Sequence, residues 1–133
     1  MYPLYDIKTV KTAASGALSF FEEGHDIDMS FKRIFYIHGV AEGENRGGHA
    51  HKENKQFLFC VYGSVLVTYD DGKTKEKYVL DNPGKGLFVK PGIWLDLEWI
   101  TENSVLCVVS SDYYDESDYI RDYDEFLRWI NES

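Results

Sequence analysis

The chain has 133 residues, a net charge of −9 and a hydrophobic fraction of 44%. This length suits a single domain over residues 1–133, and the ordinary apolar content indicates a folded globular chain. The acidic balance argues against a nucleic acid as partner, because a phosphate backbone requires a basic face. No apolar stretch approaches the length of a membrane span.

The N-terminus and the cysteines predict a cytoplasmic protein. Asp6 and Lys8 come early, and no apolar segment of the kind found in signal peptides precedes or follows them. Cys60 and Cys107 lie in separate apolar runs without CxxC or zinc-type spacing. We therefore expect buried free thiols in a reducing compartment.

Short runs rich in β-branched and aromatic residues alternate with turns that contain Gly, Pro, Asn or Asp. Many short strands at this spacing predict an all-β sandwich or barrel. The predicted strands are Phe31–Val40, Gln56–Tyr62, Val65–Tyr69, Gly86–Val89, Leu95–Ile100 and Val105–Ser110.

The segment Arg46-Gly47-Gly48-His49-Ala50-His51-Lys52 carries the strongest candidate for a functional site. Residues two apart on a strand project to the same side, so His49 and His51 should point together. Each imidazole titrates near neutrality, and a pair in one cavity can exchange protons with two adjacent carbons.

Two further elements follow along the chain. The Asp70-Asp71-Gly72 turn, between two apolar runs, predicts a β-hairpin. A helix is predicted over about 117–131, with Ser117 as its N-cap. Its apolar face would consist of Tyr119, Ile120, Tyr123, Phe126, Leu127 and Ile130.

The spacing around the two histidines resembles the cupin family. The HxH is followed by four residues and Gln56, then by six residues and Gly63, as in the first cupin motif. Pro91-Gly92-Ile93-Trp94-Leu95 resembles the second motif. The resemblance implies a single cupin-type jelly-roll β-barrel, to which the predicted helix adds a short C-terminal α-helix.

The metal ligands of a cupin are incomplete in this chain. Cupin metal sites use three histidines and a glutamate, but Gln56 replaces the glutamate and Leu95 stands where the third histidine would fall. Two imidazoles without an anionic ligand fall short of the usual three or four protein ligands. His25 and His38 do not have a converging spacing. We therefore expect no metal and no other cofactor.

Within the cupins, the chain resembles the sugar 3,4-ketoisomerases from about Phe31 to Phe126. The similar segments are Arg46–Lys52, Phe35-Tyr36-Ile37, Gly86-Leu87, Pro91–Trp94 and Ser111–Arg121. This resemblance implies an enzyme that moves the keto group of dTDP-4-keto-6-deoxy-D-glucose from C4 to C3. It also implies a cytosolic homodimer that exchanges N-terminal strands, and products that feed 3-amino-3,6-dideoxy sugars of surface polysaccharides. Ser15 and Leu95 replace an Arg and a His that are usual in the family.

The expected chemistry assigns the catalytic roles. One of His49 and His51 should remove the C3 proton, while the other moves a proton between the oxygens or delivers one to C4. Tyr36 is expected to donate a hydrogen bond to the enediolate oxygen, and Gln56 is a second candidate donor.

Four more residues are candidates for substrate binding. Arg46 should bind the pyrophosphate or a sugar oxygen, and Lys52 is a weaker candidate because it acts as a point charge. Trp94 could line the sugar pocket or serve only in packing. Arg33 could contact the substrate or form a salt bridge with the acidic C-terminal tail.

Three alternatives stay open. A related nucleotide-sugar epimerase would also abstract a proton beside a ketone, but would use a His–Asp pair and a Tyr in a different pattern. A non-catalytic cupin would only bind a small ligand. A metal-dependent dioxygenase or isomerase would need a bound ion.

Overall fold

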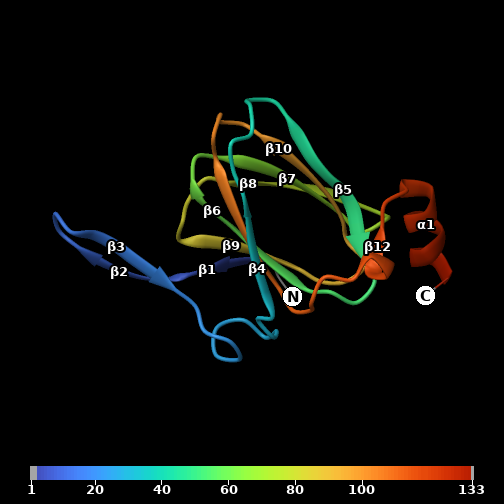
Figure 1. Ribbon diagram of the computed structural model, residues 1–133, viewed down its shortest axis with the longest axis horizontal. Coiled ribbons are helices and arrows are strands. Elements are labelled where there is room, and N and C mark those ends of the chain that lie inside the picture. The colour runs from blue at the N-terminus through green and yellow to red at the C-terminus, as the bar shows by residue number, and fades with distance from the viewer. Residues whose placement is uncertain (1–2, 133) are drawn as a thin grey trace.

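The computed structural model describes residues 3–132, which form strands, one 3₁₀ helix and one α-helix (Figure 1). The first strands are β1 (Leu4–Asp6), β2 (Lys8–Thr12), β3 (Gly16–Phe20), β4 (Arg33–Ile37), β5 (Asn45–His51), β6 (Gln56–Tyr62) and β7 (Val65–Asp70). They are followed by β8 (Lys75–Leu80), β9 (Lys85–Val89), β10 (Trp94–Trp99), β11 (Val105–Ser110), η1 (Glu116–Asp118), β12 (Tyr119–Ile120) and α1 (Tyr123–Glu132).

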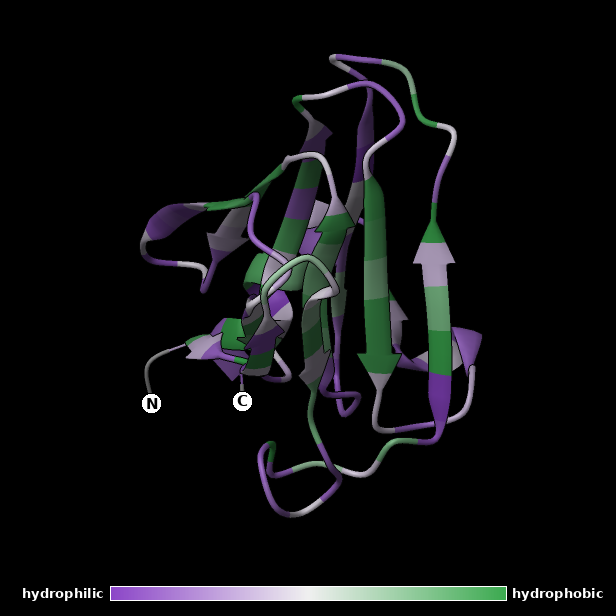
Figure 2. Cartoon of the chain, turned by 90° about the vertical axis from the view of Figure 1, so that its left-hand side faces the viewer, coloured by the Kyte–Doolittle hydropathy of each residue, from purple (hydrophilic) through white to green (hydrophobic). Residues whose placement is uncertain are grey.

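Two antiparallel five-stranded sheets, β1-β9-β6-β11-β4 and β12-β5-β10-β7-β8, face each other. Alternate residues of each strand point inward and form the core between the sheets, which includes Leu58, Val67, Trp99 and Leu106. Figure 2 shows the apolar residues concentrated on these strands. The all-β class is therefore confirmed, and a strand is present at each predicted position, although β4 is shorter than the predicted Phe31–Val40.

The outer face of the β1-β9-β6-β11-β4 sheet is also apolar. Phe57, Phe88 and Val109 are buried on this face beneath Ile27 and Met29, which belong to the irregular segment before β4. The cover is incomplete near β4, where Ile34 and Tyr36 remain 67% and 63% exposed.

The hairpin of β2 and β3 projects away from both sheets (Figure 1). All residues of the two strands are exposed. Val10 lies opposite Leu18 in the register, and Phe20 follows on the same face, so one face of the hairpin is apolar and uncovered. Ser15 lies in the turn at the tip of this hairpin.

The C-terminal region corrects the predicted helix boundaries. Tyr119 and Ile120 form strand β12, which pairs with His51 and Ala50 of β5, because the edge of β5 offers backbone hydrogen-bond partners. Ser117 lies within the 3₁₀ helix and is not an N-cap.

The true α-helix spans Tyr123–Glu132, and the Asp122 side chain accepts a hydrogen bond from the Glu125 amide at 3.0 Å before its first turn. Phe126 packs against Trp94. Within residues 3–132, no helix is long and apolar enough to cross a membrane.

The predicted hairpin at Asp70-Asp71-Gly72 joins β7 to β8. The Asp70 side chain accepts a hydrogen bond from the Gly72 amide at 2.8 Å. Gly72 has a φ of 92°, a conformation that residues with a side chain rarely adopt.

Gly86 provides a test of this packing. A Cβ at Gly86 would lie 2.1 Å from Cζ of the fully buried Phe57. We expect Gly86→Ala to lower the free energy of unfolding by about 1–3 kcal/mol, because the buried ring has no room to move. Urea denaturation measures this change. Gly84→Ala is the control, since its nearest contact is the Asn82 side chain at 3.2 Å. Equal stability of the two variants would contradict the packing.

Candidate active site

Two glycines orient the histidine strand. Gly47 and Gly48 have φ values of 97° and 73°, and a Cβ at Gly47 would lie 2.9 Å from the Leu95 carbonyl oxygen. In the pairing of β5 with β10, Leu95 is opposite His49 and the next residue, Asp96, is opposite Gly47. Gly48 is therefore the extra residue of a β-bulge. The bulge shifts the alternation of β5, so Arg46 and His49 both reach the same cavity.

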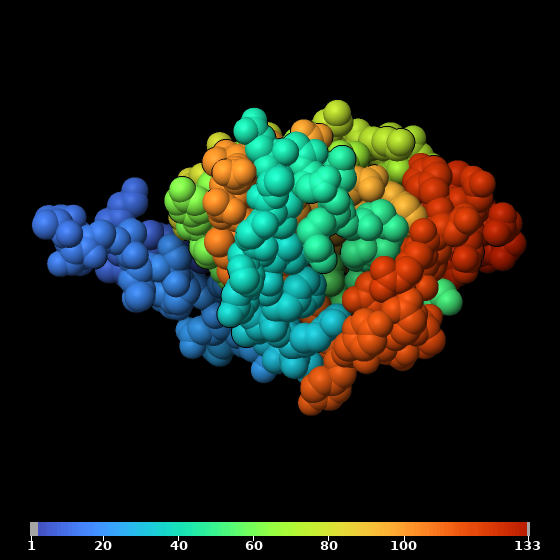
Figure 3. Space-filling model, turned by 45° about the horizontal axis from the view of Figure 1, so that its top comes forward, coloured from blue at the N-terminus to red at the C-terminus, as the bar shows by residue number. Residues whose placement is uncertain are grey.

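This cavity has a volume of about 300 Å³ and lies between the two sheets. In Figure 3 the surface is hollowed between the cyan and green segments that carry β4 and β5. Polar groups from three parts of the chain line the cavity beside apolar residues. The lining consists of Phe35, Ile37, Arg46, Gly47, His49, Gln56, Leu58, Leu95, Leu97, Val108, Tyr119 and Arg121.

His49, His51 and Tyr119 form a cluster of rings. The centroids of the two imidazoles are 5.2 Å apart, and the Tyr119 ring lies 4.3 Å from His51 and 5.3 Å from His49. His51 is buried, with 5% of its surface exposed. Tyr119 reaches the cluster because β12 pairs with the end of β5. The predicted convergence of the two histidines is therefore present in the structure.

Burial lowers the pKa of both histidines, because the protonated imidazole loses its hydration. The pKa of His49 falls to about 4, through burial first and then through the charges of His51 and Arg121. The pKa of His51 is also lowered by burial, while its hydrogen bond to Asp118 acts in the opposite direction. Both rings are thus held as neutral bases.

Asp118 of η1 is the hydrogen-bond partner of His51. Its Oδ2 lies 2.9 Å from His51 Nδ1, and its Oδ1 accepts from the Glu53 amide at 2.7 Å. The other ring nitrogen, Nε2, is buried and has no hydrogen-bond partner among residues 3–132. A His–Asp pair, which we expected of a related epimerase, is therefore present in this chain.

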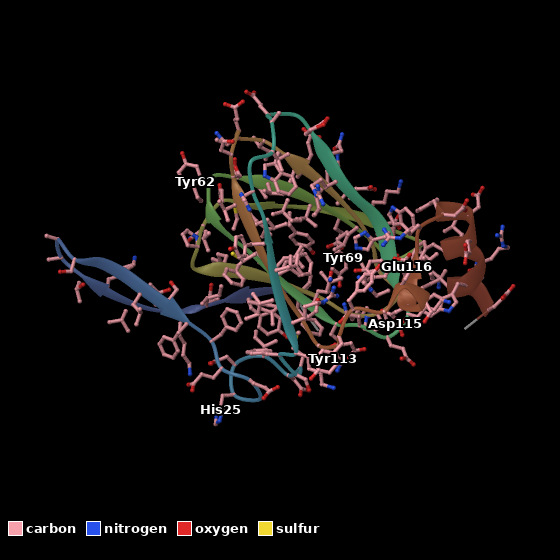
Figure 4. The ribbon with its side chains drawn as sticks, viewed as in Figure 1. His25, Tyr62, Tyr69, Tyr113, Asp115 and Glu116 are labelled. Atoms are coloured by element: carbon pink, nitrogen blue, oxygen red, sulfur yellow. The ribbon has the colours of Figure 1, made fainter. Side chains whose placement is uncertain are left out.

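Arg121 lines the cavity and is held by two neighbours. Its Nε donates to Glu116 at 2.8 Å, and its guanidinium lies 4.3 Å from the centroid of the Tyr119 ring. The bonds from Arg121 and Tyr114 lower the pKa of Glu116 to about 2. Figure 4 labels Glu116 and Asp115 beside the end of β5. Arg121 therefore forms a salt bridge with Glu116 and also lines the cavity.

Gln56 and Arg33 lie on the inner face, in one row with Ser110 of β11. Gln56 Nε2 and Arg33 Nη2 each donate to Ser110 Oγ at 3.4 Å. The Arg33 guanidinium lies 5.6 Å from the ring of Tyr114. Within the described part of the chain, Arg33 forms no salt bridge with the acidic tail, and its buried Nε has no partner.

Five predicted site residues are not among those that line the cavity, namely His51, Arg33, Tyr36, Trp94 and Lys52. Tyr36 is on the outer face of β4, because Phe35 and Ile37 take the inward positions of that strand. Trp94 is on the outer face of β10 and packs against Tyr123 and Phe126. Lys52 is exposed in the turn after β5.

Tyr119 and Asp118 are the site residues that sequence reasoning missed. Both lie in the segment that resembles the 3,4-ketoisomerases, but the helical spacing of its apolar residues concealed the strand. The resemblance in that segment was the signal that could have identified them.

The remaining histidines lie elsewhere. His25 is in the loop before β4, away from Glu116 and Asp115 (Figure 4), and His38 is exposed beside Tyr36. Among residues 3–132, no three His, Cys, Asp or Glu side chains are grouped in a way that could hold a metal ion.

Comparisons with known proteins agree on one family. The family model described as "FdtA: WxcM-like, C-terminal" matches residues 2–131. A TDP-4-oxo-6-deoxy-alpha-D-glucose-3,4-oxoisomerase from Aneurinibacillus thermoaerophilus is 44% identical over 115 residues, which are 86% of this chain and 83% of the relative.

Solved structures give the same result. A 3,4-ketoisomerase from Helicobacter canadensis superposes with a TM-score of 0.93 at 35% identity, covering 98% of this chain and 97% of that one. QdtA, a sugar 3,4-ketoisomerase from Thermoanaerobacterium thermosaccharolyticum solved with TDP, has a TM-score of 0.92 at 35% identity, covering 97% of this chain and 93% of its own. The 4-keto-6-deoxy sugar epimerase NovW from Streptomyces spheroides is 16% identical with a TM-score of 0.75, which shows a shared fold alone. With the match over nearly its whole length, this chain belongs to the FdtA family.

Proposed function

We propose that this chain is a sugar 3,4-ketoisomerase that moves the keto group of TDP-4-keto-6-deoxyglucose from C4 to C3. The observation that carries the proposal is the pair of neutral imidazoles whose centroids lie 5.2 Å apart, with His49 lining the cavity and His51 buried beside it. Relatives at 44% and 35% identity are named for this activity. A histidine-to-asparagine variant of QdtA was solved with TDP-4-keto-6-deoxyglucose.

The reaction needs only proton transfers. A base removes the proton from C3, and the electron pair forms a C3–C4 double bond while the C4 carbonyl becomes an enolate oxygen. Transfer of the C3 hydroxyl proton to the C4 oxygen then turns C3 into the new ketone and C4–O⁻ into a hydroxyl, while the electron pair of the double bond takes up a proton at C4. His49 and His51 supply the base and the proton carrier, a contribution of about a hundred- to ten-thousandfold.

The cavity offers donors for the enediolate and the phosphates. Tyr119 takes the place that we expected for Tyr36, because its ring lies against both histidines. Its hydroxyl and the Gln56 amide are the proposed donors to the oxygen that gains charge. Arg46 and Arg121 both line the cavity, and their guanidinium groups suit phosphate oxygens.

A nucleotide-sugar epimerase is the second candidate, because His51 pairs with Asp118 at 2.9 Å. The epimerases in the comparison are only 14% and 16% identical, whereas the ketoisomerases reach 35% and more. An epimerase would leave the carbonyl at C4. Carbon NMR of the product separates the two reactions by the position of the ketone.

We also propose that the protein is a homodimer in which each hairpin of β2 and β3 lies on the partner. The support is the uncovered apolar face of Val10, Leu18 and Phe20, together with the exposed Ile34 and Tyr36 on the outer face of β4. Burial of such surface drives association of proteins.

An exchanged hairpin would also explain the position of Ser15. This residue lies at the tip of the hairpin, which extends away from the two sheets that carry the cavity residues (Figure 1). A contact between position 15 and a substrate would then be made in the partner's cavity.

A cytoplasmic location remains part of the proposal. Cys60 and Cys107 are free thiols on neighbouring strands of one sheet. Free thiols of this kind persist in a reducing compartment.

The first prediction concerns the histidine pair. We expect His49→Asn and His51→Asn each to lower kcat by about 10²–10⁴-fold with the fold intact, because asparagine cannot carry the proton. NMR of the TDP-keto sugar in deuterated water measures deuterium at C4 and the new C3 ketone. His25→Asn, in a distant exposed loop, is the control. Full activity of both site variants would reject the acid–base mechanism, and binding without any deuterium uptake by the wild type would indicate a non-catalytic cupin.

The second prediction concerns pH. A base must be neutral, and the pKa of His49 is about 4 against 6.5 for an ordinary histidine. The neutral form therefore dominates at every pH above about 4, so kcat/KM should stay level as the pH falls through 6.5 and decline only near the lowered pKa. Circular dichroism at each pH controls for unfolding. An acidic limb centred at 6.5 would show that the histidine is solvated.

The third prediction concerns the dimer. Leu18→Glu should convert the dimer to a monomer, because it places a charge in the apolar face that the partner covers. Light scattering coupled to size-exclusion chromatography measures the mass. Lys11→Glu, on the opposite face of the same hairpin, is the matched control and should stay dimeric. A monomeric wild type would overturn the proposal.

A further inference from the structure

We infer that Asp118 is a positioning residue that fixes His51 in the tautomer protonated at Nδ1, so that Nε2 is the atom that accepts and returns a proton. The inference deepens the proposed function and rests on it, since it concerns the same pair of histidines.

The hydrogen bonds around Asp118 determine the tautomer. An ionised carboxylate can only accept hydrogen bonds, so the 2.9 Å contact between Asp118 Oδ2 and His51 Nδ1 requires the proton on Nδ1. The lone pair is then left on Nε2. That nitrogen is buried and has no hydrogen-bond partner among residues 3–132. Its lone pair is therefore available to accept a proton from a substrate.

The backbone holds Asp118 in place. Its Oδ1 accepts from the Glu53 amide at 2.7 Å, and its Oδ2 also accepts from the Asn54 amide at 3.3 Å. Both amides belong to the turn that follows His51, and the Lys52 amide donates to the Asp118 carbonyl oxygen at 3.0 Å. The carboxylate therefore cannot turn away from the ring without breaking the turn.

The groups around His51 show how the Asp118 carboxylate affects the pKa of the ring. His49 and Tyr119 lie against the ring, and the charges of Arg33 and Arg121 lower its pKa. The hydrogen bond and the negative charge of Asp118 raise its pKa. By opposing the effect of burial on the pKa, Asp118 allows His51 to take up a proton during the reaction.

The substitution Asp118→Asn would put one oxygen and one amide nitrogen in place of two equivalent oxygens. The Glu53 amide makes the shorter bond, 2.7 Å against 3.3 Å for the Asn54 amide, so the new side chain keeps its oxygen at Glu53, gives up the longer bond and turns its nitrogen toward His51. An amide nitrogen can only donate, and a hydrogen bond needs an acceptor on the other side. His51 Nδ1 must therefore become the acceptor, and the ring proton moves to Nε2. The lone pair then faces residue 118, and Nε2 can no longer accept a proton.

The test combines NMR with kinetics on the full chain. In protein labelled with ¹⁵N-histidine, long-range ¹H–¹⁵N spectra identify the protonated ring nitrogen and titrate His51. We expect Nδ1–H in the wild type and Nε2–H in Asp118→Asn, together with a fall in kcat of about 10²–10⁴-fold. The pKa of His51 should fall further in the variant, because a negative charge has been removed.

Asp115→Asn is the matched control. Asp115 accepts from the Ser117 amide at 3.0 Å and so supports the same 3₁₀ helix, but no bond joins it to His51. This variant should keep the Nδ1–H tautomer and activity within a few-fold of the wild type.

Three results would overturn the inference. The first is Nε2–H on His51 of the wild type, which needs no variant to fold. The second is an unchanged tautomer in Asp118→Asn. The third is a rise of the His51 pKa toward 6.5 in that variant, which would mean that Asp118 only maintains the packing that excludes water. The tautomer is read without substrate, so a wild type with Nδ1–H and no turnover would reject the proposed function while leaving the positioning role intact.

Discussion

The removal of two imidazoles from water is the constraint on which the site depends. Because the charged form of a buried histidine loses its hydration, burial keeps His49 and His51 neutral where solvated histidines would begin to take up protons. The charge of a protonated His51 lowers the pKa of His49 further. A neutral imidazole close to a second one can take a proton from carbon and pass it on, which is the chemistry that the proposed reaction requires.

The short strand β12 supplies the rest of the site. By pairing with the edge of β5, it places the Tyr119 ring against His51 and brings Arg121 to the cavity. The same pairing brings Asp118, the residue before β12, within hydrogen-bond distance of His51. The same pairing protects a strand edge that would otherwise be open. One interaction of the backbone thus serves both the stability of the sheet and the arrangement of the polar groups.

The two faces of the β1-β9-β6-β11-β4 sheet have separate roles. Its inner face contributes Gln56 and apolar residues to the cavity, while its outer face is covered in part by the segment before β4. Tyr36 belongs to the outer face. The aromatic content of the chain therefore reflects packing on two surfaces, and only part of it lies near the histidines.

The sequence by itself determined the elements that depend on neighbours along the chain. Alternating apolar residues and turn signals predicted the strands and the hairpin at Asp70-Asp71-Gly72, and the HxH spacing predicted that His49 and His51 would point together. Gln56 and Arg46 were also expected beside them, and both line the cavity. The inference for the two histidines holds because side-chain direction on a strand follows from residue spacing, whereas Arg46 reaches the cavity through the bulge at Gly48.

Only the tertiary structure decided which face of a strand points inward and which distant segments come into contact, because both depend on the neighbouring strands. Both faces of β4 carry apolar residues, so the sequence could not tell that Phe35 and Ile37, rather than Tyr36, point inward. Tyr119 and Ile120 fit a helical spacing, yet the free edge of β5 draws them into a strand. The contact of Asp118 with His51 spans 67 positions of sequence, and no local pattern records such a pairing.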